Sequence, residues 1–236
     1  MQRYFGESIE NNTFKLKNDD VYHISKVMRM KINDKIEVVY NQKVYLCNIE
    51  SFNPFECFIE KELDIDNENK YQIKLIQSMV NETKMDLILQ KGTEVGINDF
   101  YPYSAINSVN KDNGKMDKKI IRWQRIVKEA AEQSKRNIIP VVHDLIKISD
   151  ISKIQGDLKL LLSVNECQVT LKSILQKHKN YGTIIIVVGP EGGFTKEEEE
   201  MFVGNGYIRT SIGKRVLRSE TASVVVASMI NYEWMV

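Results

Sequence analysis

The sequence predicts an α/β protein whose mostly parallel sheet is preceded by a small N-terminal domain of short strands. From about residue 71, apolar runs typical of buried strands alternate with segments of helical periodicity, which favours a wound parallel sheet. Before that point, short segments of alternating polarity are separated by turn residues. We therefore expect two domains, residues 1–70 and residues 71–236.

The N-terminal domain is expected to contain three strands and one helix. The strand candidates alternate apolar and polar side chains, and Asn41 and Gln42 offer a turn between two of them. These strands are expected at residues 34–40, 44–49 and 55–60. A helix is expected at residues 20–30, where apolar side chains recur at helical spacing. Residues 62–70 are polar and acidic, and we interpret them as the domain linker.

The C-terminal domain is expected to alternate between strands and helices. The strand candidates are apolar runs at residues 73–79, 158–163, 184–188 and 207–212. Helices are expected at residues 83–96, 118–135, 171–178 and 222–234, and one more begins after Thr195. Thr83 with Asp86, and Thr195 with Glu198, have the spacing of a capping box at a helix start.

Composition favours a soluble cytoplasmic protein. Charged residues make up 28% of the chain, and no apolar run approaches the roughly 18 residues of a membrane span. No apolar segment typical of a secretory signal follows Met1. The three cysteines (Cys47, Cys57 and Cys167) lack metal-ligand spacing, and an odd number does not suit a disulfide framework. We expect reduced cysteines and no bound metal.

Charge is unevenly distributed along a chain whose formal net charge is only +1. Residues 1–70 hold 10 Lys and Arg against 13 Asp and Glu, whereas residues 111–136 hold nine basic and four acidic residues. A local basic strip of this kind can contact nucleic-acid phosphates without making the whole protein basic. A solvated helix face explains the same charges equally well.

Two glycine-containing segments near the C-terminus are the strongest candidates for a ligand site. Residues 189–194 (Gly-Pro-Glu-Gly-Gly-Phe) and residues 213–222 (Gly-Lys-Arg-Val-Leu-Arg-Ser-Glu-Thr-Ala) each follow a predicted strand. Open α/β sheets bind ligands at such strand ends, where glycine lets the backbone approach closely. Neither segment has the spacing of a dinucleotide fingerprint or of a P-loop, so a nucleotide-like ligand without a pyrophosphate is expected.

These segments and four others resemble, in order, the signatures of the RsmE family of ribosomal RNA methyltransferases. The resemblance covers essentially the whole chain. The other matching segments are residues 1–5, residues 23–34, and the two central segments at residues 90–96 and 129–140. The family belongs to the SPOUT superfamily, so the resemblance implies a C-terminal trefoil knot and a PUA-like β-barrel at the N-terminus. Ordinary topology rules disfavour knots, and only the resemblance predicts one here.

The resemblance implies an activity as well as a fold. It implies S-adenosylmethionine as the cofactor and a methyl transfer to N3 of a specific uridine in the 16S rRNA of the small ribosomal subunit. It also implies a homodimer, which would suit the apolar side chains of the C-terminal helix. The alternatives are a related enzyme that methylates a ribose 2′-oxygen or N1 of a tRNA guanine, and a noncatalytic RNA-binding or ribosome-assembly factor.

Three loops are implied to hold the cofactor, largely through backbone groups. Their residues are Ser163, Val164 and Asn165, then Gly189, Pro190, Glu191, Gly192 and Gly193, and finally Ile212, Gly213, Val216, Leu217 and Arg218. Glu191 could accept hydrogen bonds from the cofactor's ribose hydroxyls or ammonium group. Alternatively, it could only cap the turn in which it lies.

The methyl transfer requires a positioned uracil and stabilisation of charge on its O2 and O4 atoms. Arg218 or Arg215 could polarise these oxygens, although Arg218 could instead form an ion pair with Glu220 or Glu94. An arginine stays protonated and is a poor general base, so the proton must be removed either by Glu220 or without a base, with the help of nearby positive charge. Arg136 is the third candidate catalytic residue.

Five cations are implied to contact RNA, and they are Arg3, Lys26, Arg29, Lys91 and Arg136. Lys91 could instead form an ordinary exposed ion pair with Glu94. One position departs from the family pattern, because Asn107 stands where the family usually has an arginine. If that arginine binds RNA, another cation such as Lys111 must compensate for its loss.

Overall fold

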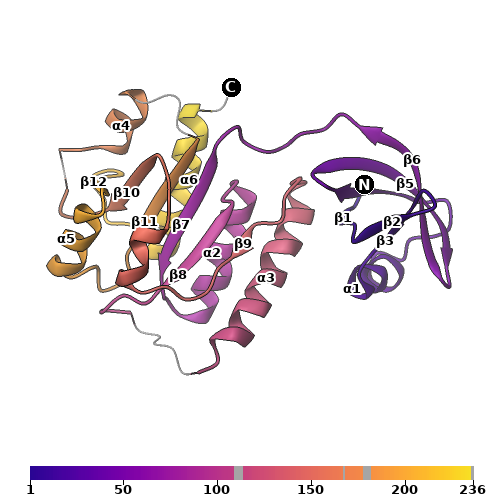
Figure 1. Ribbon diagram of the computed structural model, residues 1–236, viewed down its shortest axis with the longest axis horizontal. Helices are drawn as coiled ribbons and strands as arrows, with labels where there is room; N and C mark the ends of the chain where they lie inside the picture. Colours follow the sequence, from indigo (N-terminus) through magenta and orange to yellow (C-terminus); the bar gives the residue numbers. More distant parts are fainter. Residues whose placement is uncertain (109–113, 167, 178–181, 235–236) are drawn as a thin grey trace. The chain divides into compact units, whose positions relative to one another are not determined.

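The computed structural model describes residues 1–108, 114–166, 168–177 and 182–234 (Figure 1). The chain divides into two compact units. Unit 1 contains Met1–Glu68 and Ala131–Ile138, and unit 2 contains Asn69–Ala130 and Ile139–Val236. This division differs from a single boundary at residue 70, because a short segment from the middle of the chain packs with the N-terminal residues.

Unit 1 is built on a six-stranded sheet with the strand order β1-β4-β5-β6-β3-β2. The strands are β1 (Arg3–Phe5), β2 (Ser8–Glu10), β3 (Thr13–Lys15), β4 (Lys35–Tyr40), β5 (Lys43–Phe52) and β6 (Phe55–Leu63). β1 pairs with β4 in parallel and the other pairings are antiparallel. The three longer strands match the predicted ones. The three N-terminal strands have three residues each, too short to show a repeating pattern.

The predicted helix at residues 20–30 is divided into two elements that pack on the core of unit 1. An α-helix, α1 (Asn18–Tyr22), passes directly into a π-helical turn, η1 (His23–Val27). Ile24 is fully buried and belongs to the same hydrophobic cluster as Tyr4 and Phe14. Cys47 and Cys57 also lie in this cluster, as free thiols. Cys167 lies outside the described residues.

Unit 2 is built on a second six-stranded sheet with the order β12-β10-β11-β7-β8-β9. Each of its pairings is parallel. The strands are β7 (Gln72–Ser78), β8 (Asp99–Tyr103), β9 (Val141–Val142), β10 (Leu158–Leu162), β11 (Thr183–Val188) and β12 (Ile208–Thr210). Neighbours in the sheet are thus far apart in the sequence, and their carboxyl ends share one edge.

Helices cover both faces of this sheet. They are α2 (Glu82–Glu94), α3 (Met116–Gln133), η2 (Ile148–Lys153, a 3₁₀ helix), α4 (Leu171–Lys177), α5 (Lys196–Gly204) and α6 (Ser219–Trp234). Their starts agree only partly with the predicted caps. Thr195 and Glu198 form the predicted capping box of α5. The N-cap of α2, however, is Asn81, whose side chain accepts from the backbone N–H of Lys84, so the prediction that Thr83 caps this helix is wrong.

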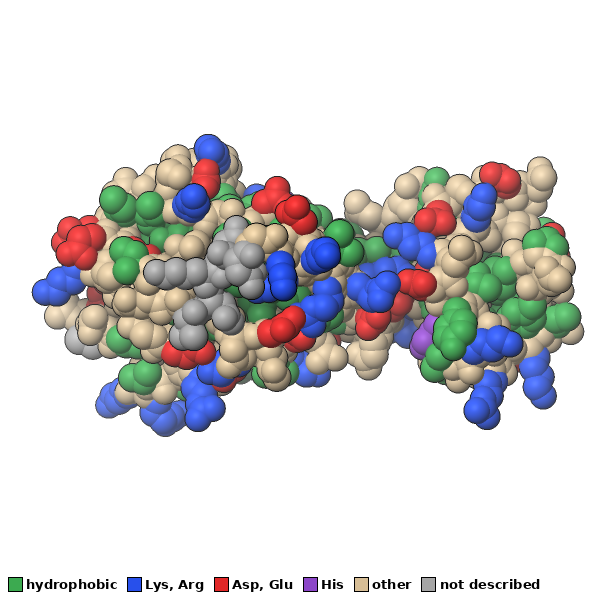
Figure 2. All heavy atoms as spheres, turned by 90° about the horizontal axis from the view of Figure 1, so that it is seen from below, with side chains coloured by type: hydrophobic (Ala, Val, Ile, Leu, Met, Phe, Trp, Pro, Cys, Tyr) green, Lys and Arg blue, Asp and Glu red, His purple; other side chains and the backbone are tan. Residues whose placement is uncertain are grey.

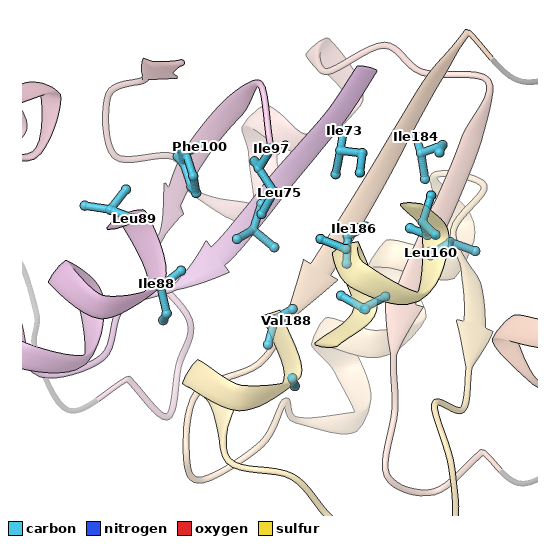
Figure 3. Packing of buried hydrophobic residues seen from close by; sticks show 14 of the residues in the cluster. Ile73, Leu75, Ile88, Leu89, Ile97, Phe100, Leu160, Ile184, Ile186 and Val188 are labelled. Atoms are coloured by element: carbon cyan, nitrogen blue, oxygen red, sulfur yellow. The ribbon is translucent and has the colours of Figure 1, made fainter. Parts of the chain in front are cut away.

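Alternate residues of the central strands face two different hydrophobic clusters. Ile184 and Ile186 of β11 pack in a cluster that includes residues of α2, α3, α4 and α6. Figure 3 shows this side of the sheet, with Ile88 and Leu89 of α2 near the strands. Ile185 and Val187 instead join Phe202 of α5 on the other face. Burial on both faces explains why β11 reads as a continuous apolar run.

No helix in the described parts of the chain is long and apolar enough to cross a membrane.

Candidate functional site

Three loops meet at the carboxyl edge of the unit 2 sheet. They follow β10, β11 and β12, which are neighbours in the sheet and run in the same direction. The described residues of these loops are 163–166 with 168–170, 189–195 and 211–218. They contain every residue that the sequence assigned to cofactor binding. Only the sheet order brings them together, since β11 lies next to β10 and β12 lies on the other side of β10.

The glycine loop after β11 is tied to the start of α6 by a buried polar network. The Ser219 hydroxyl donates to the carbonyl oxygen of Gly189 at 2.7 Å and accepts from Nε2 of Gln77 at 2.9 Å. The Ser223 hydroxyl donates to Oε1 of the same glutamine at 2.5 Å. Gln77 and Ser223 are fully buried. Sequence analysis missed this network, although a glutamine near the end of a buried apolar strand is a signal that could have indicated it.

Asn107 also anchors the glycine loop. Its side-chain amide donates to the carbonyl oxygens of Gly193 at 3.1 Å and Gly192 at 3.4 Å. A Cβ atom at Gly192 would lie 3.2 Å from the Cβ of Asn107, so the two segments approach closely. Gly193 has φ +69, a left-handed backbone that favours glycine. The residue that departs from the family pattern is thus in contact with the loop expected to hold the cofactor.

The loop after β10 is held at its first residue. Ser163 is buried, and its hydroxyl donates to Oε1 of Glu199 at 3.0 Å while accepting from the backbone N–H of Asn165 at 3.3 Å. The other oxygen of Glu199 accepts from Nε of Arg209 at 2.9 Å. Val164, in contrast, is 71% exposed. A fixed base and an exposed tip leave the backbone of this loop accessible to a ligand.

The loop after β12 exposes its charged side chains. Gly213 has φ +138, and a Cβ atom added there would meet nothing within 4 Å. Ile212 and Leu217 are partly buried against the main core, and Val216 is 79% exposed. Arg215 and Arg218 are both exposed. The alternative role of Arg218, an ion pair with Glu220 or Glu94, is not among the ion pairs of the described residues.

A lysine from α2 joins two carboxylates at this edge. Nζ of Lys84 lies 2.9 Å from Oε1 of Glu191 and 3.6 Å from Oε2 of Glu220. The hydrogen bond from Lys84 holds the pKa of Glu191 below its ordinary value, and the bond to Glu191 raises the pKa of Lys84. The positive charge of Arg218 opposes this rise in the pKa of Lys84. Lys84, Glu191, Arg218 and Glu220 therefore form one charged cluster, in which the sequence had not placed Lys84.

The structure differs from the expectation for Arg136 and Arg3, because both are buried in unit 1. Nη2 of Arg136 pairs with Oε2 of Glu68 at 2.7 Å, and Nε of Arg3 pairs with Oε2 of Glu37 at 2.9 Å. Glu68 also accepts from the backbone N–H of Asn137 at 2.8 Å. Either arginine would have to leave a buried ion pair to contact RNA, which is costly. Burial in these ion pairs favours a structural role for both arginines, and the expected RNA contacts and the catalytic role of Arg136 stay predictions.

The other expected RNA-contacting cations lie at the surface. Lys26 and Arg29 are exposed, and Arg29 has φ +52, an unusual left-handed backbone for a non-glycine residue. Lys91 forms the anticipated pair with Glu94, at 2.8 Å. Lys111 lies outside the described residues. Lys and Arg side chains are interspersed with Asp and Glu side chains over the face shown in Figure 2, consistent with the small net charge.

Comparison with known proteins identifies relatives over nearly the whole length of the chain. A family described as an RNA methyltransferase domain matches residues 67–231, and one described as an RNA methyltransferase PUA domain matches residues 16–61. A protein of Bacillus subtilis (strain 168) named Ribosomal RNA small subunit methyltransferase E is 31% identical, over 99% of this chain and 97% of that protein. A protein of the same name from Mesomycoplasma hyopneumoniae (strain 232) is also 31% identical, over 95% and 96%.

A solved structure also matches this chain over nearly its whole length. The crystal structure of a Ribosomal RNA small subunit methyltransferase E from Neisseria gonorrhoeae, bound to S-adenosyl methionine, matches with a TM-score of 0.89. That protein is 30% identical, and the match covers 99% of this chain and 98% of that chain. The likeness thus extends over both units of the fold.

Proposed function

Because the chain belongs to the Ribosomal RNA small subunit methyltransferase E family, we propose that it methylates N3 of a specific uridine in 16S rRNA. It is an S-adenosylmethionine-dependent rRNA methyltransferase. The single observation that carries the proposal is the convergence of the three loops at one sheet edge, in a chain that matches a cofactor-bound relative over its full length.

The loops have the properties needed to hold S-adenosylmethionine. Gly193 and Gly213 carry no side chain, and a Cβ atom at either would meet only open space. Oε2 of Glu220 is buried and has no hydrogen-bond partner among the residues that the structure describes, so it can accept from a ligand. We propose that residues 163–165, 189–193 and 212–218 hold the cofactor with backbone groups. When bound, the cofactor supplies a methyl group on a positively charged sulfur.

The charged side chains at this edge suit a uridine substrate. N3 of uracil becomes nucleophilic when its proton leaves, and negative charge then develops on O2 and O4. We propose that exposed Arg218 stabilises this charge and that Glu220 accepts the proton. The support is that both belong to the charged cluster beside the glycine loop. Lys26, Arg29 and Lys91 are proposed to contact RNA phosphates.

The remaining family features are also proposals. We propose that residues 1–70 form a PUA-like β-barrel domain that binds RNA, and that residues 71–236 form the methyltransferase domain with a trefoil knot. We further propose that the enzyme is a homodimer. On α6, Ala227 is fully buried and is explained by the core of one chain, whereas Met229 and Tyr232 are 40% and 81% exposed and are available to a second copy.

The direct test is methyl transfer from labelled S-adenosylmethionine to small ribosomal subunits that lack the modification, followed by nucleoside analysis. We expect label in 3-methyluridine. Label in a 2′-O-methylated nucleoside or in 1-methylguanosine would keep the fold and cofactor but replace the substrate. Cofactor binding without labelled product would indicate a different RNA. Failure to bind the cofactor would favour a noncatalytic RNA-binding factor.

Replacing Arg218 with alanine is expected to lower kcat by about 100-fold, as expected when a group that stabilises transition-state charge is lost. Cofactor affinity should fall much less, because the loops bind mainly through backbone groups. Single-turnover methylation and calorimetric titration with S-adenosylmethionine measure the two effects. Arg215→Ala is the matched control, since Arg215 is exposed in the same loop. A large loss of kcat in Arg215→Ala alone would transfer the role to that residue.

A further inference from the structure

Lys84 occupies a position that helix stability does not explain. It lies in the first turn of α2, where the side chain of Asn81 accepts from its backbone N–H at 2.9 Å. The N-terminus of a helix carries a partial positive charge, so a lysine there is unfavourable for the helix. The same helix places Glu82, a favourable residue, in this turn. The ammonium group of Lys84 therefore calls for a different explanation, which its partners supply.

Lys84 connects two segments that are remote in the sequence. Its Nζ donates to Oε1 of Glu191 at 2.9 Å, and it lies 3.6 Å from Oε2 of Glu220. Glu191 lies in the glycine loop after β11, and Glu220 lies in the first turn of α6. The Lys84 side chain is 23% exposed and that of Glu220 only 12%, so solvent screens this contact less than it would screen a surface pair. One cation thus restrains both the proposed cofactor loop and the proposed base.

The two contacts differ in kind. The contact with Glu191 is a hydrogen bond, whereas the distance to Glu220 allows charge attraction without a hydrogen bond. Oε2 of Glu220 is buried, and no described residue donates to it. Lys84 therefore restrains Glu220 without using its accepting position. A buried carboxylate oxygen that accepts no hydrogen bond is costly unless a ligand supplies one.

We propose that Lys84 is a positioning residue for methyl transfer, which fixes the glycine loop through Glu191 and holds Glu220 with one oxygen free to accept a proton or hydrogen bond from the bound substrate. This inference rests on the proposed function, because the substrate is the one proposed above. It assigns no chemical step to Lys84 itself, whose effect is exerted through the two carboxylates.

The charge states of the cluster agree with this role. The hydrogen bond from Lys84 lowers the pKa of Glu191, so this carboxylate stays ionised even somewhat below its ordinary pKa. The pair is lost on the acidic side only as pH falls through the lowered pKa. The bond to Glu191 raises the pKa of Lys84, so the ammonium group stays protonated even somewhat above its ordinary pKa. The pair is lost on the basic side only as pH rises through the raised pKa. Glu220 and Arg218 are the other charged groups that act on Lys84. The Lys84–Glu191 pair therefore persists on both sides of neutral pH.

The test is a pair of double-mutant cycles. The single variants are Lys84→Met, Glu191→Gln and Glu220→Gln, and each glutamine variant is also combined with Lys84→Met. We expect Lys84→Met to raise the Kd for S-adenosylmethionine about tenfold, as Glu191→Gln does, and to lower kcat about tenfold, as Glu220→Gln does. In each double variant, the change in Kd or kcat should be no larger than in the more affected single variant, because the effects of substituting coupled residues are not additive.

Rescue and controls separate positioning from general stability. Lys84→Arg keeps the positive charge and should restore most of the lost activity. Lys153→Met is the matched control, because Lys153 forms an exposed ion pair with Asp150 at 2.7 Å elsewhere in unit 2, and it should leave Kd and kcat unchanged. If Lys84→Met fails to fold, Lys84→Gln replaces it, since glutamine keeps a donor but removes the charge.

The outcomes are distinct from failure of the proposed function. Additive losses in the double variants, or a lower melting temperature with unchanged Kd and kcat, would overturn the positioning role. If the natural chain binds cofactor but does not methylate 16S rRNA, the proposed function fails. The Lys84–Glu191 cycle is still measured by cofactor titration in that case, and coupling there would retain the loop-fixing half of the inference.

Discussion

Replacing Gly192 with valine is expected to abolish S-adenosylmethionine binding. A Cβ atom at this position would already lie 3.2 Å from the Cβ of Asn107, and valine adds two more carbons. The larger side chain would separate the glycine loop from Asn107 and occupy space beside the backbone that is proposed to face the cofactor. Calorimetric titration with S-adenosylmethionine measures the loss, and circular dichroism establishes that the variant is folded.

Two further variants show whether the loss belongs to the glycine loop. Gly204→Ala is the matched control, because a Cβ atom there would meet nothing within 4 Å, and cofactor affinity should not change. Asn107→Ala keeps Gly192 but removes the amide that donates to Gly193. It should weaken binding only about two- to tenfold, the effect of one neutral hydrogen bond. Normal affinity in folded Gly192→Val would remove residues 189–193 from the cofactor site.

Replacing Arg136 with alanine is expected to destabilise the protein by about 3–5 kcal/mol, the usual cost of breaking a buried ion pair. The guanidinium is 5% exposed and pairs with Glu68 at 2.7 Å, and its removal leaves that carboxylate without its arginine. Oε1 of Glu68 would keep hydrogen bonds from the backbone N–H groups of Asn137 and Ile138, but these do not supply a charge. Chemical denaturation measures the loss in free energy of unfolding.

The comparison is with an ion pair at the surface of the same unit. Lys35 pairs with Glu60 at 2.7 Å, but the lysine side chain is 47% exposed. Lys35→Ala should therefore cost at most about 1 kcal/mol. If Arg136→Ala instead keeps full stability and cofactor affinity but loses rRNA methylation, the arginine acts on RNA or in catalysis, and our structural assignment fails.

Local pattern was sufficient to predict most of the longer elements. The continuous apolar run of β11 and the alternation of β4 both correspond to strands of the structure. The capping box at Thr195 also forms as predicted, because its residues are three apart and need no distant partner. The same reasoning failed at Thr83, where the pattern was present but Asn81, two residues earlier, is the cap. Asparagine and threonine are both favoured N-cap residues, so the spacing from Thr83 to Asp86 alone did not identify the cap.

Residues 62–70 show where local pattern was insufficient. Their acidic composition indicated a linker, yet Glu68 pairs with buried Arg136 and accepts from two backbone N–H groups. The charge of Arg136 likewise suggested RNA contact, although its partner lies 68 residues away in the sequence. Charge and spacing do not reveal whether an arginine is exposed or paired, because burial depends on contacts between remote segments.

The order of motifs along the sequence was enough to indicate the family, its cofactor and the three loops proposed to hold it, because the residues of each motif are neighbours in the sequence. The side chains that surround those loops follow from tertiary contacts. The order of strands in the sheet places β10, β11 and β12 side by side, and the packing of α2 brings Lys84 to Glu191 and Glu220. The contacts of Lys84 join residues more than 100 positions apart in the sequence, and no local periodicity encodes a contact at such a separation.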